Sequence, residues 1–218
     1  MSEVTGPGSA GAEAEPFQNG ELVGGRYEIA ALLGRGGMGV VYQALDRDLG
    51  RTVAIKVLPR PHCDDARAVE RFLRQARAMA RIEHRSAVSV YDRGLHGELP
   101  YVIMERLVGR DLRELLRASG RLSVPRALAL GIELCEAVHA AHQQQLVHRD
   151  LKPSNVFLTQ IDAVETVRLL DFGIAKIADS SDLTGTTDVL GTLAYMAPEQ
   201  LASGSDASVQ SDLYAIAC

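Results

Sequence analysis

Hydrophobic positions in the first part of the chain recur with the period of β-strands. The clearest case is Arg51–Leu58, where Val53, Ile55 and Val57 occupy every second position. Such alternation is typical of a strand with one buried face. Similar short apolar runs predict further strands at residues 27–29, 40–44, 88–91 and 101–104. The first part of the chain therefore predicts a small sheet.

The period then lengthens between Asp64 and Glu83. Phe72, Gln75, Met79 and Ile82 recur at three- and four-residue intervals, which places them on one face of a helix. We therefore expect a single amphipathic helix inside the strand-rich part.

The second part of the chain predicts mainly helices. Asp111 is a suitable N-cap for a short helix that ends near Gly120. Ser123 is a suitable N-cap for a long helix to about residue 143, with Pro125 in its permissive first turn. The pattern divides the chain into a smaller unit at 23–108 and a larger one at 109–218.

Residues 1–22 differ in amino-acid composition from the rest of the chain. They are rich in Gly, Ala, Ser and Glu, and no bulky aromatic residue occurs before Phe17. Such a segment buries too little apolar surface to offset the entropy of ordering it. The composition predicts disorder for 1–22.

Composition narrows the function classes. The 218 residues are 46% hydrophobic and carry a net charge of −5, which favours a globular protein and argues against a nucleic-acid binder. Cys63, Cys135 and Cys218 match no metal or redox spacing. No apolar run approaches the roughly 20 residues that span a bilayer, and the N-terminus lacks signal-peptide features. We expect a cytoplasmic protein, while a membrane anchor beyond Cys218 stays open.

The first chemical motif is the glycine-rich run 34–41, which reads G-x-G-x-x-G-x-V. Dinucleotide-binding turns share its first part, so the run alone is weak evidence. Here it leads into a strand rather than a helix, and a second strand follows that ends in Lys56. Glycines let a backbone close over phosphates, and a lysine in this place is suited to hold the α- and β-phosphates.

The strongest motif is the run 148–155, His-Arg-Asp-Leu-Lys-Pro-Ser-Asn. Phosphoryl transfer to a hydroxyl needs a nearby carboxylate, a cation and an oxygen ligand for magnesium. Asp150, Lys152 and Asn155 supply one each. An Asp-Phe-Gly run begins at Asp171, and an Ala-Pro-Glu run ends at Glu199.

In this order, the motifs resemble those of eukaryotic-like (Hanks-type) protein kinases, and bacterial serine/threonine kinases most closely, over residues 22–218. The resemblance implies an α+β, protein kinase-like bilobal fold. Its N-lobe would be a small antiparallel sheet with one helix, and its C-lobe would be mainly helical. It also implies a Mg²⁺- and ATP-dependent enzyme that phosphorylates Ser and Thr of protein substrates. Lys152, two residues after Asp150, is the serine/threonine-kinase form of the loop.

The resemblance further implies residue roles. Asp150 would be the catalytic base, assisted by Lys152 and Lys56, while Asn155 and Asp171 would bind Mg²⁺. Met104 would be the gatekeeper beside adenine. The full set implied at the nucleotide is Leu33, Gly34, Gly36, Gly39, Val41, Ala54, Lys56, Met104, Glu105, Leu107, Asp111, Asn155 and Asp171.

Regulation is implied as well. The activation segment would run from Asp171 to Glu199 and contains Thr184 and Thr186, the positions that similar kinases autophosphorylate. A kinase-domain dimer would allow this reaction in trans. Arg149, beside the catalytic aspartate, would receive the phosphate, because a phosphothreonine can order such a loop against arginine.

Two features depart from the family pattern. Gln75, nineteen residues after Lys56, stands where such kinases place a glutamate that pairs with the lysine. Glu70 is turned away by about 140° on the same helix and cannot easily replace it. The second departure is the end of the chain, where residues 211–218 resemble only the start of the central helix of the larger lobe. Asp212 in that helix would brace the catalytic loop.

Two alternatives to the kinase hypothesis remain. Gln75 and the short C-lobe favour a nucleotide-binding pseudokinase, a scaffold or an inactive kinase fragment. The complete set of Lys56, Asp150, Asn155 and Asp171 argues against this. A small-molecule phosphotransferase is the other alternative, and the Ala-Pro-Glu motif argues against it.

Overall fold

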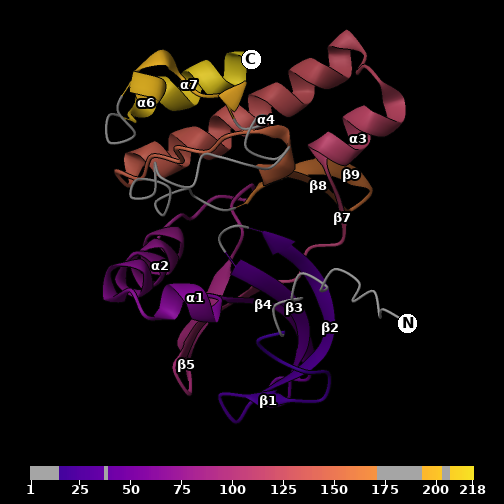
Figure 1. Ribbon diagram of the computed structural model, residues 1–218. Helices are drawn as coiled ribbons and strands as arrows, with labels where there is room; N and C mark the ends of the chain where they lie inside the picture. The colour runs from indigo at the N-terminus through magenta and orange to yellow at the C-terminus, as the bar shows by residue number, and fades with distance from the viewer. Residues whose placement is uncertain (1–14, 37–38, 171–192, 203–206) are drawn as a thin grey trace, which may run out of the picture.

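The computed structural model describes residues 15–36, 39–170, 193–202 and 207–218. The chain forms two lobes, a strand-rich lobe at the bottom of Figure 1 and a helical lobe at the top. The expected bilobal arrangement is therefore confirmed. The chain crosses between the lobes after residue 105, close to the predicted boundary.

The smaller lobe is built on one six-stranded antiparallel sheet. In spatial order its strands are β1 (Leu22–Val23), β2 (Tyr27–Gly36), β3 (Gly39–Asp46), β4 (Arg51–Val57), β6 (Leu99–Glu105) and β5 (Val90–His96). The expected strand at 88–91 begins two residues later and continues to His96.

The two faces of this sheet pack against different parts of the protein. One face carries the core of the lobe, formed by Val40, Tyr42, Val53, Ile55, Ile103 and their neighbours. Because side chains alternate along a strand, Val41, Ala54 and Lys56 lie on the opposite face. Helix α2 covers part of that face through Phe72 and Ala76.

Two helices follow β4. Pro59 precedes the short α1 (Arg60–Cys63), and Asp65 caps α2 (Ala66–Met79) by accepting a hydrogen bond from the Arg67 N–H at 2.9 Å. The α2 helix is shorter than the expected span of 64–83. The apolar period continues past its end because Ile82 still packs beside Met79 from a turn.

The larger lobe contains mostly helices and a small sheet. Its elements are β7 (Gly109–Asp111), α3 (Leu112–Ser119), α4 (Val124–Gln143), a 3₁₀ turn (Pro153–Asn155), β8 (Val156–Ile161), β9 (Val164–Leu169), α6 (Pro198–Ala202) and α7 (Val209–Ala217). Both predicted helix starts are confirmed, and the Asp111 carboxylate accepts the Glu114 N–H at 2.7 Å. Within the described ranges, no helix is long and apolar enough to cross a membrane.

The β8–β9 hairpin has a tight turn. Its strands pair as far as Ile161 and Val164. The turn is only Asp162 and Ala163, whose φ angles of 49° and 63° lie in the left-handed region. All other residues between 156 and 169 therefore belong to the two paired strands.

The expected disorder of 1–22 is wrong for the described residues from 15 onward. Phe17 is 1% exposed and belongs to the sheet core. Its N–H donates to the Tyr42 hydroxyl at 3.3 Å, and its ring meets that of His96 edge-on at 5.5 Å. A single aromatic residue in a polar segment gives no periodic signal, so the sequence pattern could not reveal this anchor.

Burial of Phe17 leads to the first testable prediction. Phe17→Ala should lower the free energy of unfolding of the full-length protein by about 3–5 kcal/mol, because it removes a buried ring and leaves a cavity. Urea denaturation measures this change. Gln18→Ala, at the exposed neighbouring position, is the matched control. Equal stability of the two variants would contradict the anchor.

Candidate active site

The turn between β2 and β3 carries the glycine-rich motif. Gly39 has a φ of +143°, and a Cβ atom there would lie 2.5 Å from the Val57 carbonyl oxygen and 3.5 Å from Lys56 Cε. Only glycine allows this close approach. Cβ atoms at Gly34 and Gly36 would meet nothing within 4 Å. The hairpin therefore lies against the lysine strand at Gly39 and faces open space at the other two glycines.

The strand register gathers the apolar residues predicted for the nucleotide. Val41 lies opposite Lys56, and Ala54 lies opposite Met104, all on the sheet face that turns away from the lobe core. Lys56 is 6% exposed and Ala54 is 5% exposed. Leu33, near the end of β2, is half-exposed. Four strands thus form the surface on which an adenine ring could lie.

The crossing between the lobes completes this surface. Glu105 ends β6, Leu107 follows it in a buried position, and Asp111 ends β7 and caps α3. The Glu105 N–H donates to the Ser89 carbonyl oxygen at 2.9 Å, which fixes the start of the crossing.

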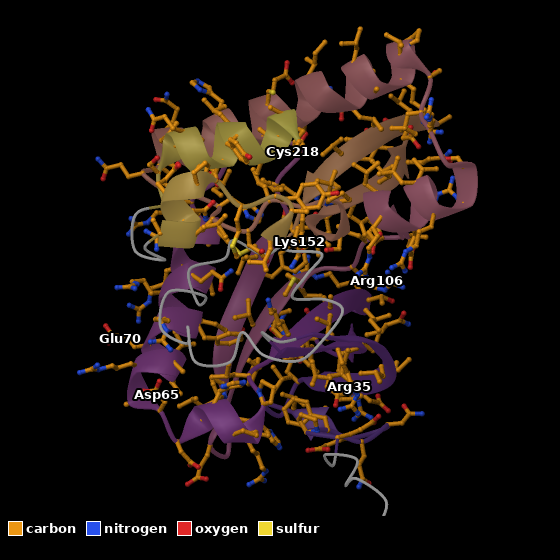
Figure 2. All side chains as sticks on the ribbon, turned by 45° about the horizontal axis from the view of Figure 1, so that its top comes forward. Arg35, Asp65, Glu70, Arg106, Lys152 and Cys218 are labelled. Atoms are coloured by element: carbon orange, nitrogen blue, oxygen red, sulfur yellow. The ribbon has the colours of Figure 1, made fainter. Side chains whose placement is uncertain are left out.

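Three residues of the predicted catalytic loop lie close together. Lys152 Nζ lies 3.1 Å from Asp150 Oδ2. Asn155 Nδ2 donates to the Asp150 carbonyl oxygen at 2.7 Å and to its Oδ2 at 3.2 Å. Figure 2 shows Lys152 where the two lobes meet. The arrangement holds the mostly buried Asp150 carboxylate in one orientation between a cation and an amide.

Asn155 also fits the role of a magnesium ligand. Its Nδ2 is used by Asp150, so the amide directs Oδ1 away from that residue, and amide oxygens are suitable ligands for Mg²⁺. Leu170, the residue before Asp171 in the chain, donates its N–H to the Asn155 carbonyl oxygen at 2.8 Å. Asp171 itself lies outside the described residues, as do Thr184 and Thr186.

A buried carboxylate supports the loop from beneath, as expected for Asp212. This side chain is 1% exposed. Its Oδ2 accepts the His148 N–H and the His142 Nε2–H, and its Oδ1 accepts the Arg149 N–H, each at 2.8 Å. Arg149 has a φ of 70°, an uncommon conformation for a residue with a side chain. The three hydrogen bonds hold this turn of the loop in place.

His148 links the loop to the strand before Asp171. Its Nδ1 accepts the Asp150 N–H at 3.3 Å, so its Nε2 carries the proton and donates to the Leu170 carbonyl oxygen at 2.8 Å. Both ring nitrogens are thereby assigned in the neutral imidazole. This bond and the contact from His142 were not predicted. The one available sequence signal for His142 was its position as a histidine in the last turn of the mainly apolar helix α4.

The Ala-Pro-Glu segment docks under the same loop. Gln200 Nε2 donates to the Arg149 carbonyl oxygen at 2.9 Å. The Ser211 hydroxyl donates to Glu199 Oε1 at 2.7 Å, and this hydrogen bond lowers the pKa of the Glu199 carboxyl. Helices α6 and α7 are thus joined to each other and to the catalytic loop.

Gln75 occupies the inner face of α2, where it is 6% exposed. Glu70 lies on the exposed outer side of the helix, as Figure 2 shows. A glutamine therefore occupies the buried position, and Glu70 does not reach the interior.

Comparison with known proteins agrees with this geometry. The protein kinase domain model matches residues 27–218. Serine/threonine-protein kinase PrkC of Bacillus subtilis is 40% identical over 197 residues, and PknA of Mycobacterium tuberculosis is 42% identical over 202. Each match covers 90% of this chain, which spans only 30% and 46% of those relatives. The crystal structure of the PknI kinase domain (C20A_R136A double mutant) from Mycobacterium tuberculosis is 29% identical, with a TM-score of 0.74 over 93% of this chain and 74% of that one.

The two lobes, the glycine-rich hairpin and the loop around Asp150 define a protein kinase catalytic fold. The chain belongs to the protein kinase domain family, among the bacterial Hanks-type serine/threonine kinases.

The Asp212 contacts predict a specific kinetic effect. Asp212→Asn removes the charge and one acceptor oxygen, and each lost hydrogen bond to a charged group costs roughly 1.5–3 kcal/mol. We expect kcat for phosphate transfer by the full-length protein to fall about 10- to 100-fold, with little change in the KM for ATP. Steady-state kinetics measure both parameters, and Asp64→Asn at an exposed site is the control. An unchanged kcat would contradict the supporting role.

Proposed function

We propose that the protein transfers the γ-phosphoryl group of Mg-ATP to Ser and Thr hydroxyls of protein substrates. The observation that carries this proposal is the convergence of Lys152 and Asn155 on the buried carboxylate of Asp150. Family membership supports it. Both relatives described above are named serine/threonine kinases.

The proposed chemistry follows from these contacts. The substrate hydroxyl loses its proton to the Asp150 carboxylate as its oxygen attacks the γ-phosphorus and the bond to the ADP oxygen breaks. Lys152 stabilises the negative charge on the transferring group, because its ammonium lies next to Asp150. Lys56 would hold the α- and β-phosphates. Magnesium, held by Asn155 and Asp171, would neutralise charge on the β- and γ-phosphates.

The nucleotide would lie between the glycine-rich hairpin and the crossing between lobes. Gly34, Gly36 and Gly39 would cover the phosphates, with Leu33, Val41 and Ala54 against the adenine ring. Met104 would limit the depth of the site, the backbone of Glu105 and Leu107 would bind adenine, and Asp111 would approach the ribose. The strand register supports this set because it places the sheet residues on one face.

Binding partners and location belong to the same proposal. The net charge of −5 supports protein rather than nucleic-acid substrates. Two kinase domains would associate for phosphorylation in trans. A cytoplasmic location of this domain agrees with its free cysteines and with its need for ATP.

Asp150→Asn is the direct test of catalysis. Loss of a general base costs about 10²- to 10⁴-fold in rate, so transfer from radiolabelled Mg-ATP to the full-length protein and a generic basic protein should nearly disappear. Asp162→Asn, in the exposed β8–β9 turn, is the matched control. Wild-type protein that binds nucleotide without any transfer would favour the pseudokinase or scaffold alternative.

Gln75→Glu tests the unusual residue on α2. A glutamine oxygen can accept a hydrogen bond but cannot neutralise a lysine, and the Lys–Glu pair is one of the parts an active kinase needs. We expect the activation free energy to fall by about 0.5–1 kcal/mol, so that kcat of the full-length protein rises several-fold. Glu70→Gln on the outer face should have no such effect. An unchanged rate in Gln75→Glu would show that the position does not limit activity.

Phosphorylation of the activation segment is a further part of the proposal. Arg149 supports it, since its Nε is buried and has no hydrogen-bond partner among the described residues. A phosphothreonine carries about −1.5 to −2 charge and could bind this guanidinium. Mass spectrometry after incubation with Mg-ATP should find phosphate on Thr184 or Thr186, at a rate that rises with protein concentration. The absence of phosphate from 180–192 would contradict this part alone.

A further inference from the structure

A buried cation on β9 connects three segments that lie far apart in the sequence. Arg168 is 6% exposed. Its Nη2 donates to Glu105 Oε2, at the crossing between the lobes. Its Nη1 donates to the carbonyl oxygen of Arg85, in the loop between α2 and β5. One side chain of the larger lobe therefore contacts both the end of β6 and the loop that follows α2.

The location of this cation is unusual for arginine. Burial lowers the pKa of the Arg168 guanidinium, because the charged form loses hydration. Arginine nevertheless stays protonated in proteins, so the charge needs compensation inside the fold. The Glu105 carboxylate and the Arg85 carbonyl oxygen provide it. Removal of the guanidinium would leave the partly buried Glu105 carboxylate without its cation.

Backbone contacts join the same three segments. The Leu169 N–H donates to the Ser86 carbonyl oxygen at 2.7 Å, and Ala87 forms a parallel bridge with Leu169. Glu105 Oε2 also accepts the Ser89 N–H at 3.4 Å. The α2–β5 loop is therefore held between β9 and the end of β6, and the Arg168 side chain lies at that junction.

We propose that Arg168 is a positioning residue for nucleotide binding. It fixes Glu105 relative to β9, the strand that leads to Asp171, and so sets the distance between the adenine-binding backbone and the magnesium-binding end of the site. Arg168 acts through Glu105 and does not itself touch the nucleotide. This inference rests on the proposed function, which assigns adenine to the backbone of Glu105 and Leu107.

The sequence contains a modest signal for this residue. Residues 167–170 are apolar except for Arg168, and a charged residue inside such a run would ordinarily point to solvent. In the structure Val167, Arg168 and Leu169 are all buried. A buried charged residue between two buried apolar residues indicates that its charge has a specific partner inside the protein.

Three variants of the full-length protein test the proposal. Arg168→Met keeps the length of the side chain and removes the guanidinium. Arg168→Lys keeps the charge and loses the fork that reaches both acceptors. Arg126→Met is the matched control. Arg126 makes a similar two-bond pair with Glu165 of the same strand, at 2.9 and 2.6 Å, and Glu105 belongs to the other sheet.

We expect the Arg168 variants to change the affinity for ATP and to leave kcat nearly unchanged. Arg168→Met should raise the KM for ATP and the Kd of a non-hydrolysable ATP analogue about 5- to 10-fold, with kcat changed less than about twofold. Arg168→Lys should recover part of the affinity, and Arg126→Met should match the wild type. Unchanged affinity in Arg168→Met, or an equal loss in Arg126→Met, would overturn the proposal.

Amide hydrogen exchange separates this inference from the proposed function. Arg168→Met should speed exchange in the segments 85–89 and 104–107 of the nucleotide-free protein, and Arg126→Met should not. Wild-type protein that binds no nucleotide would refute the proposed function, and the exchange rates would still decide whether Arg168 holds Glu105. Unchanged exchange in both segments would overturn the positioning role in either case.

Discussion

The buried carboxylate of Asp212 accepts hydrogen bonds from two backbone amides and one imidazole, and the geometry of the catalytic loop depends on it. An ionised carboxylate can be buried when such donors replace its water. Its donors come from the end of α4 and from His148 and Arg149 in the loop. Loop residues otherwise have few constraints on their backbone, so the carboxylate converts a flexible type of segment into a fixed one.

The hydrogen bonds of Asp212 also determine how the rest of the catalytic loop is positioned. With the backbone at 148 and 149 held, Asp150 faces Lys152 and Asn155, and His148 reaches the carbonyl oxygen of Leu170. Strand β9 then connects the catalytic loop to the smaller lobe, where Arg168 contacts Glu105 and Arg85. A continuous set of contacts therefore runs from α7 to the surface proposed for adenine. Polar side chains carry most of it, which agrees with the cost of leaving buried polar groups without partners.

Sequence patterns predicted the regular elements well and the irregular ones poorly. Strict alternation located β4, and the caps at Asp111 and Ser123 located α3 and α4, because local periodicity and capping are properties of a short window. The burial of Phe17 depends on contacts with residues far along the chain, such as Tyr42. No pattern within a short window contains that information.

The site shows the same division. The motifs singled out Lys56, Asp150, Lys152 and Asn155 because phosphoryl transfer demands those residue types in that order, and the structure brings the last three into contact. Family resemblance supplied the roles of Gln75 and Asp212. Neither route indicated the partners of Arg168, because they depend on which segments pack around β9. His142 was missed for the same reason, since its partner lies 70 residues further along the chain.

The central claim is that the loop around Asp150 transfers phosphate to protein hydroxyls. Phosphoamino-acid analysis tests it most directly, after incubation of the full-length protein with radiolabelled Mg-ATP and a mixture of protein substrates. We expect labelled phosphoserine and phosphothreonine, without phosphotyrosine. Intact nucleotide binding with no labelled protein would contradict it.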